Sequence, residues 1–129
     1  MIKIIALSTL IVLLVASAIS VVAASEGDVR VGEQVVLRMR AASAGMTAAE
    51  RATVIRTRLN NFLGSANFDP TSVKVQLVKG DYTVMIGNTL IVTVDETTAA
   101  LNQCTREQLA RKWASNIRTA IPAAKAIPH

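Results

Sequence analysis

Residues 89–121 constrain the fold of this 129-residue chain more than any other stretch. They open with an apolar strand pattern over residues 90–94, cross an acidic turn, and close with an amphipathic helix pattern that begins at Thr105. Trp113, the single tryptophan, falls on the apolar stripe of that helix together with Leu109 and Ile117. Because aromatic residues make up only 3% of the chain, we expect an aliphatic core that forms where this strand and this helix meet.

The N-terminal segment has the pattern of an export signal. Lys3 supplies the positive start, residues 4–22 are almost wholly apolar, and Val22, Ala23 and Ala24 fit a small-residue cleavage site. The alternative is an uncleaved inner-membrane anchor through residues 4–24, since about 20 apolar residues span a bilayer. Both interpretations predict that the remainder of the chain is exported, to the bacterial periplasm or beyond, and that residues 1–24 stand outside the fold.

Two extended segments follow the leader, over residues 29–31 and 34–40, with a turn at Gly32 and Glu33. The second segment alternates in the manner of a half-buried strand. One face carries Val35, Leu37 and Met39, and the other carries Val36, Arg38 and Arg40. We expect the set Val36, Arg38 and Arg40 to face outward as an interaction surface, and the alternative is that an edge strand supplies the contact.

A helix is predicted from Thr47 to a stop at Gly64. Thr47 and Glu50 have the spacing of a capping box, in which each side chain binds the backbone N–H of the other residue. The apolar stripe of the helix consists of Ala48, Ala52, Ile55, Leu59, Phe62 and Leu63. Three arginines, Arg51, Arg56 and Arg58, flank this stripe, and we expect their charged heads to remain in water.

Three short strands are predicted next, over residues 73–77, 82–86 and 89–94, joined by turns at Gly80-Asp81 and Gly87-Asn88. A polar connection over residues 95–104 then leads to the last helix. The order is ββ-α-βββ-α, which predicts an α+β fold in which two amphipathic helices cover one face of an antiparallel sheet of four to five strands. We expect one domain over residues 25–121 and a flexible tail over residues 122–129.

The residues that carry chemistry are sparse. The only histidine, His129, ends the chain, and the only cysteine, Cys104, has no acid or histidine near it in sequence. Metal ligands at usable spacing and a phosphate-cradling glycine loop are both missing from the sequence. Asp95 and Glu96 fit a solvated turn or the approach to a helix better than a cation site. We therefore expect no enzyme activity, cofactor, metal site or small-molecule substrate, and no nucleic-acid binding because stacking platforms are lacking.

Several segments together resemble a known extracytoplasmic domain. They are the strand over residues 35–39, the helix start Ala49-Glu50-Arg51-Ala52, the strand over residues 90–94, and the helix segment Leu109-Ala110-Arg111-Lys112-Trp113-Ala114. In this order they are similar to the periplasmic domain that precedes the membrane helices of bacterial MscS-like mechanosensitive channels. No apolar run follows Ile121, so the resemblance implies an accessory domain without the pore.

The resemblance implies a non-catalytic module for interaction or regulation, which contacts an envelope protein such as a membrane channel. The alternative is a module that binds an anionic membrane surface, because the chain carries a net charge of +5.

Overall fold

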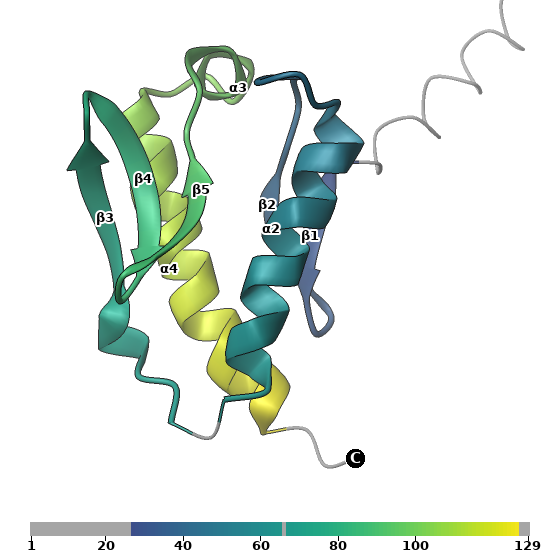
Figure 1. Ribbon diagram of the computed structural model, residues 1–129, viewed down its shortest axis with the longest axis vertical. Helices are drawn as coiled ribbons and strands as arrows, with labels where there is room; N and C mark the ends of the chain where they lie inside the picture. Colours follow the sequence, from purple (N-terminus) through teal and green to yellow (C-terminus); the bar gives the residue numbers. More distant parts are fainter. Residues whose placement is uncertain (1–26, 66, 127–129) are drawn as a thin grey trace, which may run out of the picture.

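The computed structural model of the protein describes residues 27–65 and 67–126, so the expected leader and the last residues of the expected tail lie outside the described residues. The described part begins with a hairpin and ends with a long helix (Figure 1). In chain order the elements are β1 (Asp28–Val31), β2 (Gln34–Arg38), α2 (Ala48–Leu63), the short 3-10 helix η3 (Pro70–Ser72), β3 (Val73–Val78), β4 (Asp81–Ile86), β5 (Thr89–Thr93), α3 (Glu96–Leu101) and α4 (Arg106–Lys125).

The α+β class is confirmed, but the strands divide between two antiparallel sheets where a single sheet was expected. β1 pairs with β2, and β3, β4 and β5 form a meander in that order. α4 packs against both sheets, whereas α2 packs on β1 and reaches β5 (Figure 1). Alternation predicts strands but not which strands pair, because pairing depends on segments that are distant in sequence.

The first long helix starts as predicted. The Thr47 hydroxyl accepts from the N–H of Glu50 at 3.1 Å, and the Glu50 carboxylate accepts from the N–H of Thr47 at 3.1 Å. This capping box satisfies two backbone donors that a helix start would otherwise leave open. Ala52, Ile55 and Leu59 are buried, so the predicted stripe faces the core.

The last helix is longer than predicted. Its start is capped by Thr105 with Gln108, but the helix continues past Pro122, where the flexible tail was expected to begin, and ends at Lys125. A proline costs a helix one backbone hydrogen bond. Here Ile121 before it is fully buried and Ala124 after it packs against the core, and these contacts stabilise the final turn.

A short helix, α3, replaces the polar connection expected between β5 and α4. The Asp95 carboxylate caps it by accepting from the N–H of Thr98 at 2.8 Å. Thr98 and Ala99 are buried. The expected role of the acidic turn as a helix approach is therefore confirmed at Asp95, and the loop around it is helical because its small residues fit against the core.

The meander follows the prediction closely. β3 and β4 pair from Val73 opposite Ile86 to Val78 opposite Asp81, so their turn is Lys79-Gly80, one residue before the expected position. Gly80 has a φ of 82° and Gly87 a φ of 58°. Both lie in two-residue hairpin turns, where a positive φ favours glycine.

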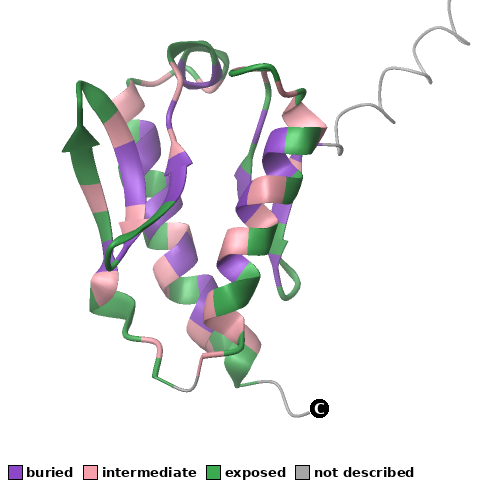
Figure 2. Ribbon diagram, in the orientation of Figure 1, coloured by how far each residue is buried: buried purple, intermediate pink, exposed green. Residues whose placement is uncertain are grey.

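The core runs between the helices and the sheets, where Figure 2 shows buried segments facing one another. Trp113 is 3% exposed, and Ile91 and Ile117 are fully buried. β5 and α4 contribute to one continuous cluster, but α4 packs mainly against β2, β3 and β4. The expected meeting of the last strand and helix is thus part of a core shared by both sheets.

Two β-bulges interrupt the strict alternation of the strands. In β2 the pairing shifts between Val29–Leu37 and Arg30–Val35, which leaves Val36 as the extra residue. In β5 a similar shift leaves Ile91 without a partner in β4. A bulge lets neighbouring side chains turn toward the same side, and it frees the carbonyl group of the extra residue from the ladder.

Helix side chains bind both freed carbonyls. The amide of Asn116, on α4, donates to the Val36 carbonyl at 2.9 Å. The guanidinium of Arg58, on α2, donates to the Ile91 carbonyl at 3.0 Å. Since an unpaired buried carbonyl is costly, each helix fixes the bulge that it covers.

Candidate functional site

Two of the three residues predicted to form an interaction surface on β2 are exposed. Arg38 and Arg40 are exposed, but Val36 is only 1% exposed. The β-bulge explains the difference, because Val36 and Leu37 are both buried although they are neighbours on one strand. Val36 therefore cannot contribute a free side chain to a surface.

The same three residues line a cavity of about 210 Å³ between β2 and α4. Arg38, Arg40 and Lys112 supply three positive charges to its lining, and Trp113 contributes to its wall. We call this site the basic cavity. The sequence pointed to its β2 side only, since Lys112 lies more than seventy residues away in the chain and the pairing of β2 with α4 could not be inferred locally.

No carboxylate lines the basic cavity within the described residues. Arg38 is partly neutralised by Asp28, whose Oδ1 lies 3.2 Å from the Arg38 Nε. Arg40 and Lys112 are exposed, and neither forms an ion pair with any described residue. The cavity therefore has a positive potential that a negatively charged group would neutralise.

Two amide side chains complete the lining. Asn102 donates to the Thr98 carbonyl at 2.8 Å, and Asn116 donates to the Val36 carbonyl at 2.9 Å. An amide carries two N–H donors, so each can offer its second one to a ligand. Cations and amides together form a donor-rich site, which suits carboxylate or phosphate oxygens.

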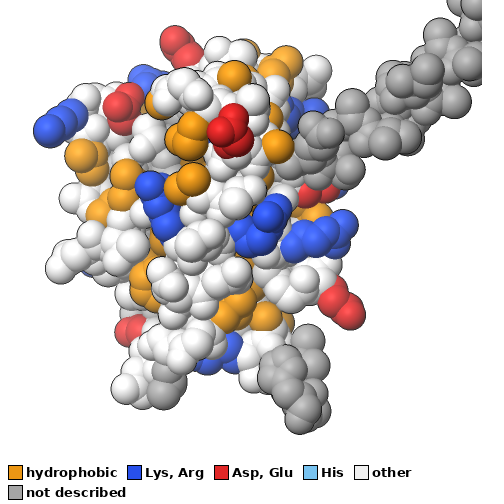
Figure 3. All heavy atoms as spheres, turned by 45° about the vertical axis from the view of Figure 1, so that its right-hand side comes forward, with side chains coloured by type: hydrophobic (Ala, Val, Ile, Leu, Met, Phe, Trp, Pro, Cys, Tyr) orange, Lys and Arg blue, Asp and Glu red, His pale blue; other side chains and the backbone are white. Residues whose placement is uncertain are grey.

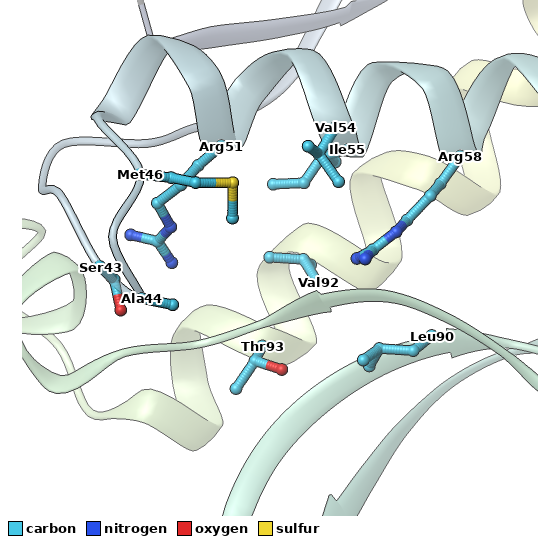
Figure 4. Close-up of a pocket in the computed structure, with 10 residues that line it drawn as sticks. All are labelled: Ser43, Ala44, Met46, Arg51, Val54, Ile55, Arg58, Leu90, Val92 and Thr93. Carbon is cyan, nitrogen blue, oxygen red and sulfur yellow. The ribbon is translucent and has the colours of Figure 1, made fainter.

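A second concave site lies between α2 and β5 and has a volume of about 320 Å³. We call it the apolar groove. Figure 4 shows Met46, Val54 and Ile55 on the α2 side, and Leu90 and Val92 on the strand opposite them. Arg51 and Arg58 project from α2 toward β5 at the two ends of this apolar stretch.

Of the three arginines of α2, Arg51 is buried, contrary to the prediction, whereas Arg56 and Arg58 are half-exposed. Arg51 is 8% exposed, and it donates to the Ala41 carbonyl at 2.8 Å. Arg56 donates to the Asp28 carbonyl at 2.9 Å, and Arg58 donates to Ile91 as described above. The stems flank the stripe as expected, but the heads bind carbonyls of loops and strands that only the folded chain brings within reach.

Asp95 receives the second hydrogen bond from Arg51, at 2.8 Å. Burial alone would raise the pKa of Asp95. Hydrogen bonds from the Thr98 backbone and hydroxyl and the interaction with Arg51 outweigh it, so the pKa is lowered from its ordinary value of 3.8. Asp95 therefore remains ionised near neutral pH and holds Arg51 in place at the end of the apolar groove.

Among the described residues, the remaining candidates for chemistry form no cluster. Cys104 is half-buried, and its Sγ lies 3.8 Å from the Ala99 carbonyl. His129 lies outside the described residues. In the described part of the chain, no three histidine, cysteine or acidic side chains gather to form a metal site, and no helix there is long and apolar enough to cross a membrane.

The face that carries α2 mixes charge and apolar surface. Figure 3 shows basic side chains across the middle of this face, hydrophobic side chains between them, and acidic side chains mostly above and below. Of the residues on this face, arginine is a type that is enriched at protein interfaces relative to the rest of the surface.

Residues 28–124 match the model of a family described as a domain of unknown function, DUF8459. The chain belongs to the DUF8459 family. No curated protein and no solved structure matches it. The matched range runs from the first residue of β1 nearly to the end of α4, so the DUF8459 domain includes both concave sites and the helix turn that follows Pro122.

Proposed function

We propose that this DUF8459 domain is a non-catalytic interaction module of the cell envelope, which binds an acidic segment of an envelope protein through the basic cavity. The observation that carries this proposal is the lining of the cavity by Arg38, Arg40 and Lys112 without a carboxylate among the described residues. The export pattern of residues 1–24 supports an extracytoplasmic location. The similarity to the accessory domain of MscS-like channels makes a membrane channel a natural partner, whose state the module would regulate.

An acidic protein segment fits the cavity better than a membrane surface does. A juxtamembrane cation contributes about 1 kcal/mol to binding an anionic bilayer, and stable attachment requires several cations on one exposed face. Here Arg38 already pairs with Asp28. The site is concave, with amides beside the cations, and this geometry suits a single carboxylate that enters the cavity.

Trp113 provides a direct test, because it is the only tryptophan and it lines the cavity. The full chain is titrated with a synthetic hexamer of glutamate while tryptophan fluorescence is recorded. We expect saturable quenching or a spectral shift. The double variant Arg40→Gln/Lys112→Gln should bind up to about 30-fold more weakly, from at most about 1 kcal/mol for each exposed ion pair that is lost.

The matched control is Lys74→Gln/Lys79→Gln, which removes the same charge from exposed positions on β3 and its turn. If both double variants weaken binding equally, the effect is one of net charge and the cavity is not the site. A pull-down from cross-linked envelopes with the wild-type and Arg40→Gln/Lys112→Gln chains then identifies the partner as the protein that only the former recovers.

The same three cations favour a second candidate function, binding to anionic lipid. Vesicles that contain phosphatidylglycerol test it. Binding that falls steeply with salt and is lost in Arg40→Gln/Lys112→Gln, while the glutamate hexamer leaves Trp113 fluorescence unchanged, would favour the lipid surface over the acidic protein.

A further inference from the structure

The outer edge of β5 presents unpaired backbone groups. Ile86 lies opposite Thr89 across the two-residue turn, and the N–H of Val94 donates to the Tyr82 carbonyl at 2.9 Å. In an antiparallel ladder, successive residues direct their backbone groups alternately toward and away from the neighbouring strand. Leu90 and Thr93, which adjoin these paired positions, therefore direct their N–H and C=O groups away from β4.

Outside the ladder with β4, no hydrogen bond among the described residues involves these four groups. Between them lies the bulged Ile91, whose carbonyl is covered by Arg58 at 3.0 Å. In a regular strand, residues 90 and 93 would direct their backbone groups to opposite edges. The extra residue of the bulge brings the backbone groups of Leu90 and Thr93 to the same edge. β5 is thus an edge strand, and its backbone can pair with a further strand at Leu90 and at Thr93, on either side of the bound Arg58 side chain.

The apolar groove runs along this edge. Leu90, Val92 and Thr93 form its strand side, and Met46 and Val54 lie across from them on the α2 side (Figure 4). Leu90 is 38% exposed although it is a large apolar residue. A volume of about 320 Å³ is at the lower end of the range of about 300–1,000 Å³ found for binding pockets, which is room for a few apolar side chains.

The charge at the groove defines what else an occupant needs. Arg51 is neutralised by Asp95 at 2.8 Å. Arg58 forms no ion pair with a described residue, and its known hydrogen bond is to a neutral carbonyl. A guanidinium has five N–H donors, so Arg58 can bind a carboxylate while it keeps its bond to Ile91.

The geometry points to β5 as the docking site for an extended segment of a partner protein, which adds as a strand at Leu90 and Thr93, places apolar side chains in the groove and pairs a carboxylate with Arg58. Main-chain hydrogen bonds supply the affinity in this mode of recognition, and the side-chain pockets supply the specificity. The site is separate from the basic cavity and goes beyond the proposed function.

The test measures amide hydrogen exchange in the full chain by NMR, with a capped peptide of sequence Val-Thr-Val-Glu-Val-Thr as the probe. We expect exchange at the Leu90 and Thr93 amides to slow by at least about tenfold at saturation. The control is the same peptide with N-methyl groups on alternate residues. It has no backbone N–H donors along one edge, so it cannot pair with β5 through that edge and should give no protection. The Val75 and Leu77 amides, on the outer edge of β3, are an internal control and should not change.

The role of Arg58 is tested with a second peptide in which glutamine replaces glutamate. The wild-type chain should prefer the glutamate peptide by about tenfold, and Arg58→Gln should abolish this preference. Arg56→Gln, a neighbouring arginine that binds Asp28 outside the groove, should retain it. The preference of the wild-type chain can be measured even if Arg58→Gln does not fold.

Protection at Val75 and Leu77 but not at Leu90 and Thr93, or equal binding of the methylated peptide, would overturn the proposal. So would equal affinity of the wild-type chain for the two peptides. In the variant Arg40→Gln/Lys112→Gln, the peptide should still slow exchange at Leu90 and Thr93, whereas the glutamate hexamer should no longer change the fluorescence of Trp113. The proposals for the two sites are therefore tested independently.

Discussion

The guanidinium of Arg51 lies 2.8 Å from Oδ1 of Asp95, which joins the first turn of α2 to the N-terminus of α3. The Arg51 side chain is 9% exposed and the Asp95 side chain 20%. Arg51 also binds the Ala41 carbonyl in the loop after β2. This one side chain therefore connects three segments at the end of the apolar groove.

We predict that Arg51→Ala lowers the free energy of unfolding by about 3 kcal/mol, because it leaves the charge of Asp95 largely buried without its partner. Urea unfolding followed by the fluorescence of Trp113 measures the effect. Arg111→Ala is the control: Arg111 pairs with Glu107 at the same distance of 2.8 Å, but its side chain is 67% exposed. Its loss should cost less than about 1 kcal/mol, and equal losses in the two variants would contradict the prediction.

We predict that Asp95 makes stability depend on pH in the acid range. Its pKa is lowered from 3.8 in the folded protein, so its contribution is complete above that value. As the pH falls below 3.8 the unfolded chain takes up the proton first, and the contribution is lost until the folded carboxyl is protonated. The free energy of unfolding, measured between about pH 5 and pH 2, should fall less steeply in Asp95→Asn than in the wild-type chain.

Asp69 provides the comparison for this pH experiment. Hydrogen bonds from the Thr71 hydroxyl and backbone also lower the pKa of Asp69, but this residue is exposed at the start of η3. Asp69→Asn should change the acid slope less than Asp95→Asn does, because solvent screens an exposed carboxylate. An equal change would show that the contact with Arg51 adds nothing to the pH dependence of the free energy of unfolding.

We predict that Gly27→Ala is strongly destabilising. A Cβ at this position would lie 1.9 Å from the Met39 carbonyl oxygen, and the backbone there is held by the hydrogen bond from the Met39 N–H to Gly27 at 2.8 Å. Moving the strands apart should cost about 3 kcal/mol in urea unfolding. Gly64→Ala is the matched control, since Gly64 has a φ of −80° and its nearest neighbour would be 4.0 Å away. A stable Gly27→Ala chain would mean that β1 and β2 separate easily at this end.

Local sequence patterns predicted most of the elements. Thr47 with Glu50 marked the start of α2, and Gly87 with Asn88 marked the second turn of the meander. These signals act within a few residues, through caps and turn geometry. The pattern failed at Pro122, because a proline usually ends a helix and only burial of the neighbouring Ile121 and Ala124 keeps this one intact.

The candidate sites were predicted less completely. Arg38 and Arg40 were identified from alternation on one strand, but Lys112 and Trp113 join them only because α4 crosses β2. The apolar groove had no local signal at all. It depends on the placement of α2 beside β5, and on Arg58 reaching a carbonyl thirty-three residues further along the chain.

The sequence by itself determined the α+β class, the order of the long elements and the apolar face of each helix, because spacing and capping act between near neighbours. Only the tertiary structure decided that the strands form two sheets, that Val36 and Ile91 occupy bulges, and that the α2 arginines bind backbone carbonyls. These outcomes depend on burial and hydrogen bonding between distant segments, and such contacts are absent from the pattern of any single segment.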